Sequence, residues 1–105
     1  ILRLAIRNLL ENALKYSPSG TPILFEMVTD EEKLALVIRV TNTRNEQSTL
    51  SDDIFERNKR GVGSLHEGSG LGLYIVREVA ELHKGEASYH LVSGHQVAFE
   101  LSIPA

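Results

Sequence analysis

Two helical patterns in this chain are each followed by a pair of strand patterns, and this order limits the folds that it can adopt. Apolar residues recur three and four positions apart over residues 1–16 and again from about 71 to 84. Stretches rich in branched and aromatic residues follow each helix as a hairpin, residues 23–29 with 33–41 and residues 86–91 with 96–103. The sequence therefore predicts an α+β fold, a two-layer sandwich whose helices pack on one face of a mainly antiparallel sheet.

Length, charge and apolar content exclude several classes of protein. The 105 residues suit one domain, and a helical pattern that starts at the first residue without a cap suggests a piece of a longer chain. The 11 Lys and Arg residues against 14 Asp and Glu residues give a net charge of −3 without a basic cluster, so nucleic acid is not an expected partner. No apolar run approaches the ~20 residues of a membrane span, so this segment is not expected to cross a membrane. The chain has no cysteine, which excludes disulfides and thiolate metal sites.

Asn8, Asn12 and Lys15 are spaced four and three positions apart in the first helical pattern, so they share one face of the helix. This polar stripe lies beside the apolar stripe, whereas Arg7 and Glu11 fall on the solvent side. Two carboxamides and an ammonium suit a magnesium-bound polyphosphate, because amide oxygens are hard ligands and Mg²⁺ is held by a few protein groups plus phosphates and water. A helix surface without any task is the alternative, most readily for Asn8 and Lys15, while a buried amide such as that of Asn12 needs partners.

Three glycines stand just before the second helical pattern, at positions 68, 70 and 72 in the stretch GSGLGL. A helix N-terminus offers unpaired N–H groups and the positive end of the helix dipole, and glycines allow a phosphate to approach them. The stretch lacks the third glycine of a dinucleotide-binding motif, and Ser69 stands where a Walker loop needs lysine. It indicates an anion site, with a plain turn as the alternative.

Between Asn42 and Gly70 the sequence is polar and lacks a period, apart from one possible helical turn over residues 50–56. A loop of this length inside so small a domain is usually functional. We therefore expect this segment to serve the function of the domain.

Three stretches in order along the chain, NLLENALKYSPSG, IFERNKRG and GSGLGLYIVREVAELHKGE, resemble the N box, F box and G2 box of bacterial sensor histidine kinases. The resemblance covers nearly the whole chain, from the first helix to the closing strand. It implies a catalytic and ATP-binding domain over residues 1–105, with the HATPase or Bergerat fold of the GHKL ATPases and a mixed sheet. The F-box aromatic is Phe55, and residues 57–69 match the mobile lid of these domains.

The resemblance assigns roles to residues in these boxes. Asn8, Glu11 and Lys15 become the polar groups nearest the transferred phosphoryl group. Asn12 becomes the magnesium ligand, and Tyr16 becomes the aromatic residue beside the base. With ATP and Mg²⁺ as the implied cofactors, the nucleotide is contacted by Asn8, Asn12, Lys15, Tyr16, Asn42, Arg60, Gly68, Gly70, Leu71 and Gly72.

The G1 box of this family, typically D-x-G-x-G after the second strand, is degenerate in this chain. Its place is taken by NTRNE, with Asn42 for the aspartate that reads adenine and with Arg44 and Glu46 for the two glycines. An Asn amide can still form a hydrogen bond with adenine, but it lacks the charge of a carboxylate. Nucleotide affinity is therefore expected to be weak, altered in base preference or lost, and Asn42→Asp is expected to tighten ATP binding.

The resemblance implies a protein histidine kinase, of which this segment is the catalytic domain only. It would bind Mg-ATP and transfer the γ-phosphate to a histidine on the separate dimerisation domain of its parent protein, with a response regulator as an indirect partner. The implied location is the cytoplasm, as the cytoplasmic part of a membrane-bound sensor. The alternatives are a degenerate docking module that binds ATP weakly or not at all and an anti-sigma-type serine kinase. A gyrase-type ATPase is disfavoured because Asn8 stands where those proteins place a catalytic glutamate.

Overall fold

The structure, a computed structural model, describes residues 1–44, 52–55 and 72–104 of the chain. Its elements follow one another as α1 (Leu2–Tyr16), β1 (Ile23–Asp30), β2 (Ala35–Thr43), the 3-10 turn η1 (Asp52–Phe55), α2 (Gly72–Leu82), β3 (Glu86–Leu91) and β4 (Gln96–Pro104). This is the predicted order of two helices, each followed by two strands, with a helical turn in the long polar segment. The second strand begins two residues later than predicted, and the second helix ends two residues earlier.

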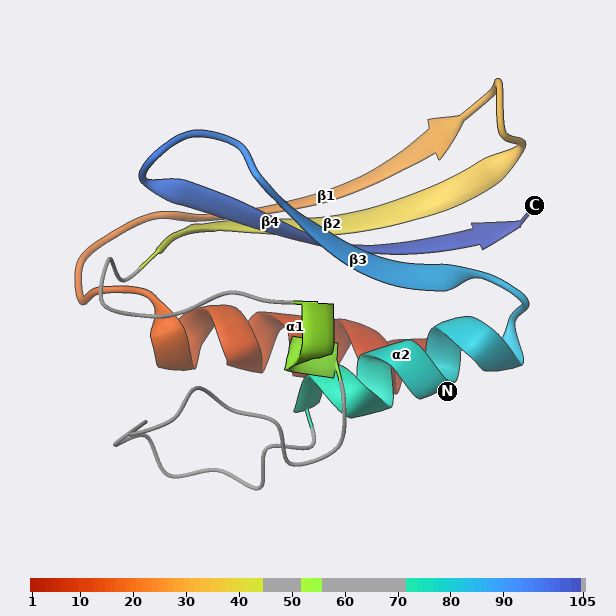
Figure 1. Cartoon of the computed structure of the whole chain (residues 1–105), viewed down its shortest axis with the longest axis horizontal. Coiled ribbons are helices and arrows are strands. Elements are labelled where there is room, and N and C mark those ends of the chain that lie inside the picture. The colour runs from red at the N-terminus through yellow and green to blue at the C-terminus, as the bar shows by residue number, and fades with distance from the viewer. Residues whose placement is uncertain (45–51, 56–71, 105) are drawn as a thin grey trace.

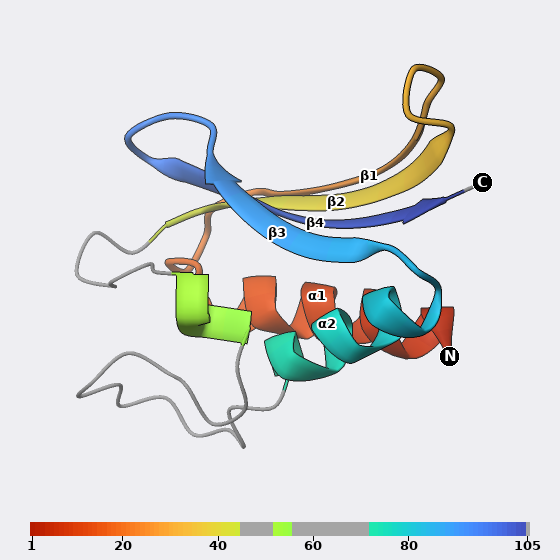
Figure 2. The same ribbon diagram turned by 45° about the vertical axis from the view of Figure 1, so that its right-hand side comes forward.

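The four strands form one sheet in the order β1-β2-β4-β3, and all three pairings between them are antiparallel. Both helices lie side by side on one face of this sheet, and no other element of the described ranges covers the opposite face (Figures 1 and 2). The predicted two-layer α+β sandwich is confirmed, while the described strands form an antiparallel sheet rather than a mixed one.

The core lies between the helices and the inner face of the sheet. It consists mainly of Ile38, Val40, Val97, Phe99, Leu101 and Ile103 from the central strands and Ala5, Leu9, Ala13, Leu73, Val76, Val79 and Ala80 from the helices. Strand alternation and the spacing of apolar residues along each helix produce this buried layer. Leu82, an apolar residue within the second helical pattern, is 69% exposed at the end of α2. Neither described helix is both long enough and apolar enough to cross a membrane.

The second helix ends in a Schellman motif around Lys84 and Gly85. The Gly85 N–H donates to the Ala80 carbonyl at 2.7 Å and the Lys84 N–H to the Glu81 carbonyl at 3.0 Å, which satisfies two carbonyl groups at the helix end. Lys84 holds the left-handed position, with a φ of 62°, that glycine usually takes. Gly85 is needed for a different reason, because a Cβ atom there would stand 1.8 Å from the carbonyl oxygen of Ser102 on β4.

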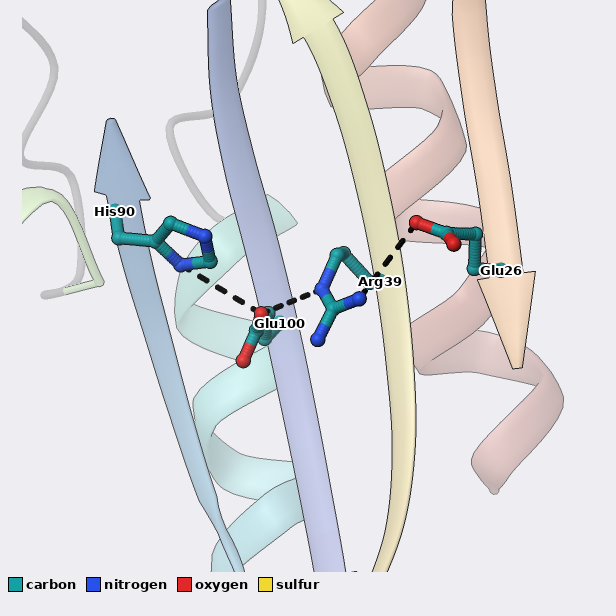
Figure 3. Close-up of polar contacts among 4 residues, drawn as sticks. All are labelled: Glu26, Arg39, His90 and Glu100. Carbon is teal, nitrogen blue, oxygen red and sulfur yellow. Dashed lines mark hydrogen bonds and ion pairs between the residues drawn. The ribbon is translucent and has the colours of Figure 1, made fainter. Parts of the chain in front are cut away.

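A row of polar, ionisable side chains crosses the outer face of the sheet and involves all four strands (Figure 3). Arg39 Nε donates to Glu100 Oε1 at 2.6 Å, and Arg39 Nη1 lies 3.7 Å from Glu26 Oε1. His90 Nδ1 lies 3.5 Å from the same Glu100 oxygen. The hydrogen bond that Arg39 donates to Glu100 is the main cause that raises the pKa of Arg39 above its usual value. The row therefore links the four strands on the side of the sheet that faces away from the helices.

Gly85→Ala should lower the free energy of unfolding by about 1–3 kcal/mol, because the new methyl group forces the connection between α2 and β3 away from β4. Lys84→Gly should raise it by up to about 1 kcal/mol, because glycine adopts the left-handed conformation without a Cβ penalty. Gly94→Ala is the matched control, since nothing lies within 4 Å of a Cβ atom at Gly94. Urea unfolding measures all three changes. An unchanged free energy of unfolding for Gly85→Ala would contradict the close approach of Gly85 to the backbone of β4.

Arg39→Met should lower the free energy of unfolding by about 1–3 kcal/mol, because it leaves the Glu100 carboxylate, only 18% exposed, without its main donor. Adding Glu100→Gln should recover part of this loss, and the double-mutant cycle measures the coupling of the pair. The control is the pair of Arg7 and Glu11 on α1, whose side chains are 74% and 56% exposed. That pair should contribute at most about 0.5 kcal/mol. Equal coupling energies for the two pairs would argue against a stabilising role for the outer row.

Candidate functional site

Four segments of the fold carry or flank the predicted site residues. The ends of α1 and β2 lie on the left in Figure 1, while η1 and the start of α2 lie close together nearer the middle. α2 packs directly against both α1 and η1. The N-box helix therefore packs against the strand that ends at the degenerate G1 box and against the helix that follows the G2 glycine stretch, and that helix contacts the F-box turn.

The polar stripe of α1 changes from half-buried to buried to exposed along the helix. Asn8 is half-buried, and its Nδ2 donates to the Leu4 carbonyl at 2.8 Å, which orients its carboxamide. Asn12 is only 5% exposed and stands next to the fully buried Ala13. Lys15 is exposed in the last turn, where the negative end of the helix dipole favours a cation. The stripe therefore lies at the rim of the core, as its spacing predicts.

Glu11 and Tyr16 have different surroundings from this stripe. The Glu11 carboxylate is exposed and accepts a hydrogen bond from Arg7 Nε at 2.9 Å on the solvent side of α1. Tyr16, the last residue of α1, is half-buried. Tyr16 is thus partly shielded by the fold, whereas Glu11 is paired on the exposed side of the helix.

Asn42 of the degenerate G1 box is 3% exposed near the end of β2. It alternates with Ile38 and Val40 along the strand and so belongs to the face that the helices cover. Its Nδ2 donates to the Thr43 carbonyl at 2.9 Å, while its Oδ1 is buried and has no hydrogen-bond partner in the described part of the chain. A buried acceptor without a donor costs about 1–3 kcal/mol, so a ligand N–H group that reached this oxygen would remove that cost.

Asn12 and Asn42 are two of the three buried polar residues in the described ranges, and they come from opposite layers of the sandwich. The third, Thr41, belongs to the outer face of β2 by strand alternation. The layer between helices and sheet is otherwise a cluster of apolar side chains, and buried polar groups normally have hydrogen-bond partners. The two carboxamides therefore distinguish this end of the sandwich from the rest of the core.

The F-box residue Phe55 anchors η1 in the core. It is 6% exposed, and its ring centroid lies 6.5 Å from that of Tyr89 on β3, which in turn lies 6.3 Å from that of Phe99 on β4. Tilted aromatic pairs at such distances contribute about 0.5–1.5 kcal/mol beyond burial. Sequence reasoning misses Tyr89, whose only signal is an aromatic side chain at an inward position of β3.

Of the glycine-rich stretch, the structure describes only the last member, Gly72, which is the first residue of α2. Arg60, Gly68, Gly70 and Leu71 lie outside the described residues. α2 has 11 residues and no acidic residue in its first turn, so no side chain of that turn offsets the positive end of its dipole. An anion at this end of α2 would therefore be favoured.

The backbone at the degenerate G1 box is regular as far as Arg44. The Arg44 N–H donates to the His95 carbonyl at 2.8 Å, one residue beyond the last pair of β2 and β4. Arg44 is not among the described residues with positive φ. Position 44 therefore does not need glycine for its conformation, and Glu46 lies outside the described residues.

Features elsewhere in the described part of the chain do not compete with this end of the sandwich. No group of three or more His, Cys, Asp or Glu side chains gathers within the described ranges to hold a metal ion. A hollow on the outer face of the sheet is lined by Leu24, Val92 and Gln96 beside Arg39 and Glu26, whose charges already pair with one another. The end of the sandwich that holds the two buried carboxamides is therefore the candidate site.

Comparison with known proteins gives a match over the whole chain. Residues 1–105 match the family described as histidine kinase-, DNA gyrase B-, and HSP90-like ATPase. The sensor histidine kinase HprS of Escherichia coli strain K12 is 37% identical over 107 residues, which cover 99% of this chain and 23% of that protein. The hybrid signal transduction histidine kinase D of Dictyostelium discoideum is 34% identical over 107 residues, which cover 94% of this chain and 7% of that protein. The chain thus spans less than a quarter of the length of either relative.

A solved structure shares the arrangement of helices and strands. The mycobacterial sensor histidine kinase MprB superposes on this chain with a TM-score of 0.72 and 24% sequence identity, over 97% of this chain and 72% of that chain. At this level of identity the likeness concerns the fold. The two helices on a four-stranded antiparallel sheet are therefore an arrangement that the two proteins have in common.

Proposed function

Because the chain belongs to the family of histidine kinase-, DNA gyrase B- and HSP90-like ATPases, we propose that it is the catalytic and ATP-binding domain of a sensor histidine kinase. The observation that carries this proposal is the burial of two carboxamides, Asn12 near the end of α1 and Asn42 near the end of β2, in a layer that is otherwise apolar. An apolar layer that receives a polar side chain from the helices and another from the sheet suits a ligand with both apolar and polar surfaces. A nucleoside triphosphate is such a ligand, because it has a flat base with polar edges and a charged phosphate chain.

In this proposal the base of ATP contacts Asn42 and Tyr16. The buried Oδ1 of Asn42 accepts a hydrogen bond from the base and so ceases to be an unpaired acceptor. Tyr16, half-buried at the end of α1, offers an aromatic surface beside the base. This part of the site provides orientation rather than charge.

The phosphates are proposed to lie along the polar stripe of α1 and at the start of α2. The carboxamide oxygen of Asn12 suits Mg²⁺, which needs only one or two protein ligands because phosphate oxygens and water complete its shell. Asn8 and Lys15 flank Asn12 on the same face, and Lys15 provides positive charge. Bound Mg-ATP would supply the phosphoryl group with part of its charge neutralised. Further backbone N–H groups and a second cation are expected from Gly68, Gly70, Leu71, Gly72 and Arg60.

We infer that the acceptor is a histidine on the dimerisation domain of the parent protein, with a response regulator as an indirect partner. Phosphoryl transfer depends on positioning and charge neutralisation more than on a reactive side chain, so a set of amides and cations suffices on the ATP side. Asn8 and Glu11 are the polar side chains proposed nearest the transfer centre. In a membrane-bound sensor this domain would lie on the cytoplasmic side.

A degenerate docking module is the second candidate, and the G1 box is the observation that favours it. Asn42 lacks the charge of a carboxylate, and Arg44 stands in regular backbone where the family has glycine. Such a module would bind nucleotide weakly or not at all and act through contacts with other domains. Calorimetric titration with ATP, ADP and a nonhydrolysable analogue, with and without Mg²⁺, separates the kinase domain from the module.

Asn12→Ala should weaken the binding of Mg-ATP by about tenfold or more, because the variant lacks the amide oxygen proposed to hold the ion. Binding of ATP in excess EDTA should change much less, which separates a lost metal ligand from a damaged pocket. Arg3→Ala, on the exposed side of α1, is the control, and circular dichroism checks the fold. Equal Mg-ATP affinities of Asn12→Ala and the wild type would refute Asn12 as a magnesium ligand.

Incubated alone with labelled ATP and Mg²⁺, the 105-residue domain should not label itself. Mixed with the dimerisation domain of its parent, it should label a histidine there, at a rate that rises with partner concentration because the two domains are not linked. Acid-labile label on the partner identifies phosphohistidine, whereas acid-stable label would indicate the serine acceptor of an anti-sigma-type kinase. Demonstrated ATP binding without label on any partner domain would favour the docking module.

A further inference from the structure

The outer face of the sheet has a hollow that the proposed nucleotide site does not use. The hollow measures about 440 Å³ and is lined in part by three members of the outer row, Glu26, Arg39 and His90 (Figure 3). We propose that this hollow is a docking site for an extended segment of a partner protein. That segment places an apolar side chain in the hollow and, two residues away, a lysine or arginine beside Glu26.

The strand register explains why the outer face is hollow at this place. Leu24, Thr41, Ala98 and His90 stand opposite one another in a single row across the four strands. Thr41 and Ala98 on the central strands are short and are 8% and 0% exposed, although no element of the described ranges covers this face. The longer side chains on the edge strands, together with Val92 after β3, therefore form walls around a low floor at Thr41.

The apolar side chains that line the hollow are partly open to solvent. Leu24 on β1 and Val92 after β3 are 55% and 51% exposed. A partner side chain between them would remove apolar surface from water, which stabilises a complex by about 25 cal/mol per Å². Thr41 and Gln96 add polar groups that can form hydrogen bonds with the backbone of the segment.

The outer row provides an unbalanced negative charge at the border of the hollow. Arg39 Nε donates to Glu100 Oε1 at 2.6 Å, whereas Arg39 Nη1 lies 3.7 Å from Glu26 Oε1, which is beyond hydrogen-bond distance. With His90 neutral, two carboxylates against one guanidinium leave a net charge of −1. The Glu26 side chain is 35% exposed, so a cation from outside can reach it. The hollow therefore favours a cationic partner over an anionic one.

The distance between the hollow and this charge defines the pattern of the partner. Leu24 and Glu26 are two positions apart on β1, as are Thr41 and Arg39 on β2, so about 7 Å separates them along the strands. An extended segment repeats the side chains of one face at the same interval. Its apolar residue over Thr41 and its basic residue at Glu26 therefore stand at positions i and i+2. Lysine and arginine lay their stems along apolar surface while the charged head stays in water, which suits this border.

NMR titration of the intact 105-residue chain with capped tripeptides tests this site. The probes are Leu-Ser-Lys, Leu-Ser-Gln and Leu-Ser-Glu, each with an acetylated N-terminus and an amidated C-terminus. Leu-Ser-Lys should shift the backbone amide signals of Thr41 and His90 to saturation. It should bind about threefold more tightly than Leu-Ser-Gln, as expected for one partly exposed ion pair, and Leu-Ser-Glu should bind most weakly.

Two variants separate the charge from the apolar wall. Glu26→Gln should remove the preference for lysine over glutamine, and Leu24→Ser should weaken the binding of all three peptides by about threefold. Glu86→Gln and Val28→Ser are the matched controls, because both residues belong to the outer face but do not line the hollow. Both controls should bind the peptides as the wild type does, and circular dichroism checks the fold of each variant.

The absence of saturable shifts at Thr41 and His90 in the wild type would overturn the docking site. Equal affinities for the three peptides would overturn the role of Glu26. Equal losses in the variants and their controls would show unspecific binding to the sheet and would overturn the site as well. Shifts of the same signals with the concentration of the chain alone would identify a second copy as the occupant, in place of a partner segment. None of these measurements involves nucleotide, so their outcome is independent of the proposed ATP binding.

Discussion

The close packing of α1 and α2 against the inner face of the sheet is the constraint on which the rest of the structure depends. Ala5, Ala13 and Ala80 are fully buried, and their small side chains let the helices approach each other and the sheet. Asn12 stands next to Ala13, so it lies at the edge of the same interface. A larger residue at position 13 would displace the polar stripe together with the helix. The apolar core therefore positions the candidate site as well as stabilising the fold.

Periodicity is enough to predict the elements of this chain, because it reports which face of each element is buried. β3 covers the predicted residues 86–91, and the helical spacing correctly places the polar stripe of α1 beside the buried face. It fails where hydrogen bonds rather than burial end an element. α2 stops at Leu82 because the turn that follows satisfies its last carbonyl groups through Lys84 and Gly85, and no apolar pattern records that exchange.

Periodicity does not predict which segments far apart in the chain come into contact, and it does not predict the hydrogen-bond partner of an individual atom. Arg39 and Glu100 are 61 positions apart, and Phe55 meets Tyr89 only because the fold brings η1 onto β3. Motif comparison has the same limit at the G1 box. It registers that Asn42 replaces an aspartate, but it does not register the Thr43 carbonyl that holds the amide. In the sequence the replacement appears only as the loss of a carboxylate, whereas in the structure the Asn42 amide and the Thr43 carbonyl form a hydrogen bond.

A neutral residue at the base end of the site changes the balance between stability and affinity. Burying an unpaired carboxylate costs several kcal/mol, whereas the amide of Asn42 has its donor satisfied and leaves one acceptor unpaired at a cost of about 1–3 kcal/mol. The empty domain is therefore more stable with the amide. The kinase domain and the docking module proposed above would share this fold, and they would differ in how often ATP occupies the site.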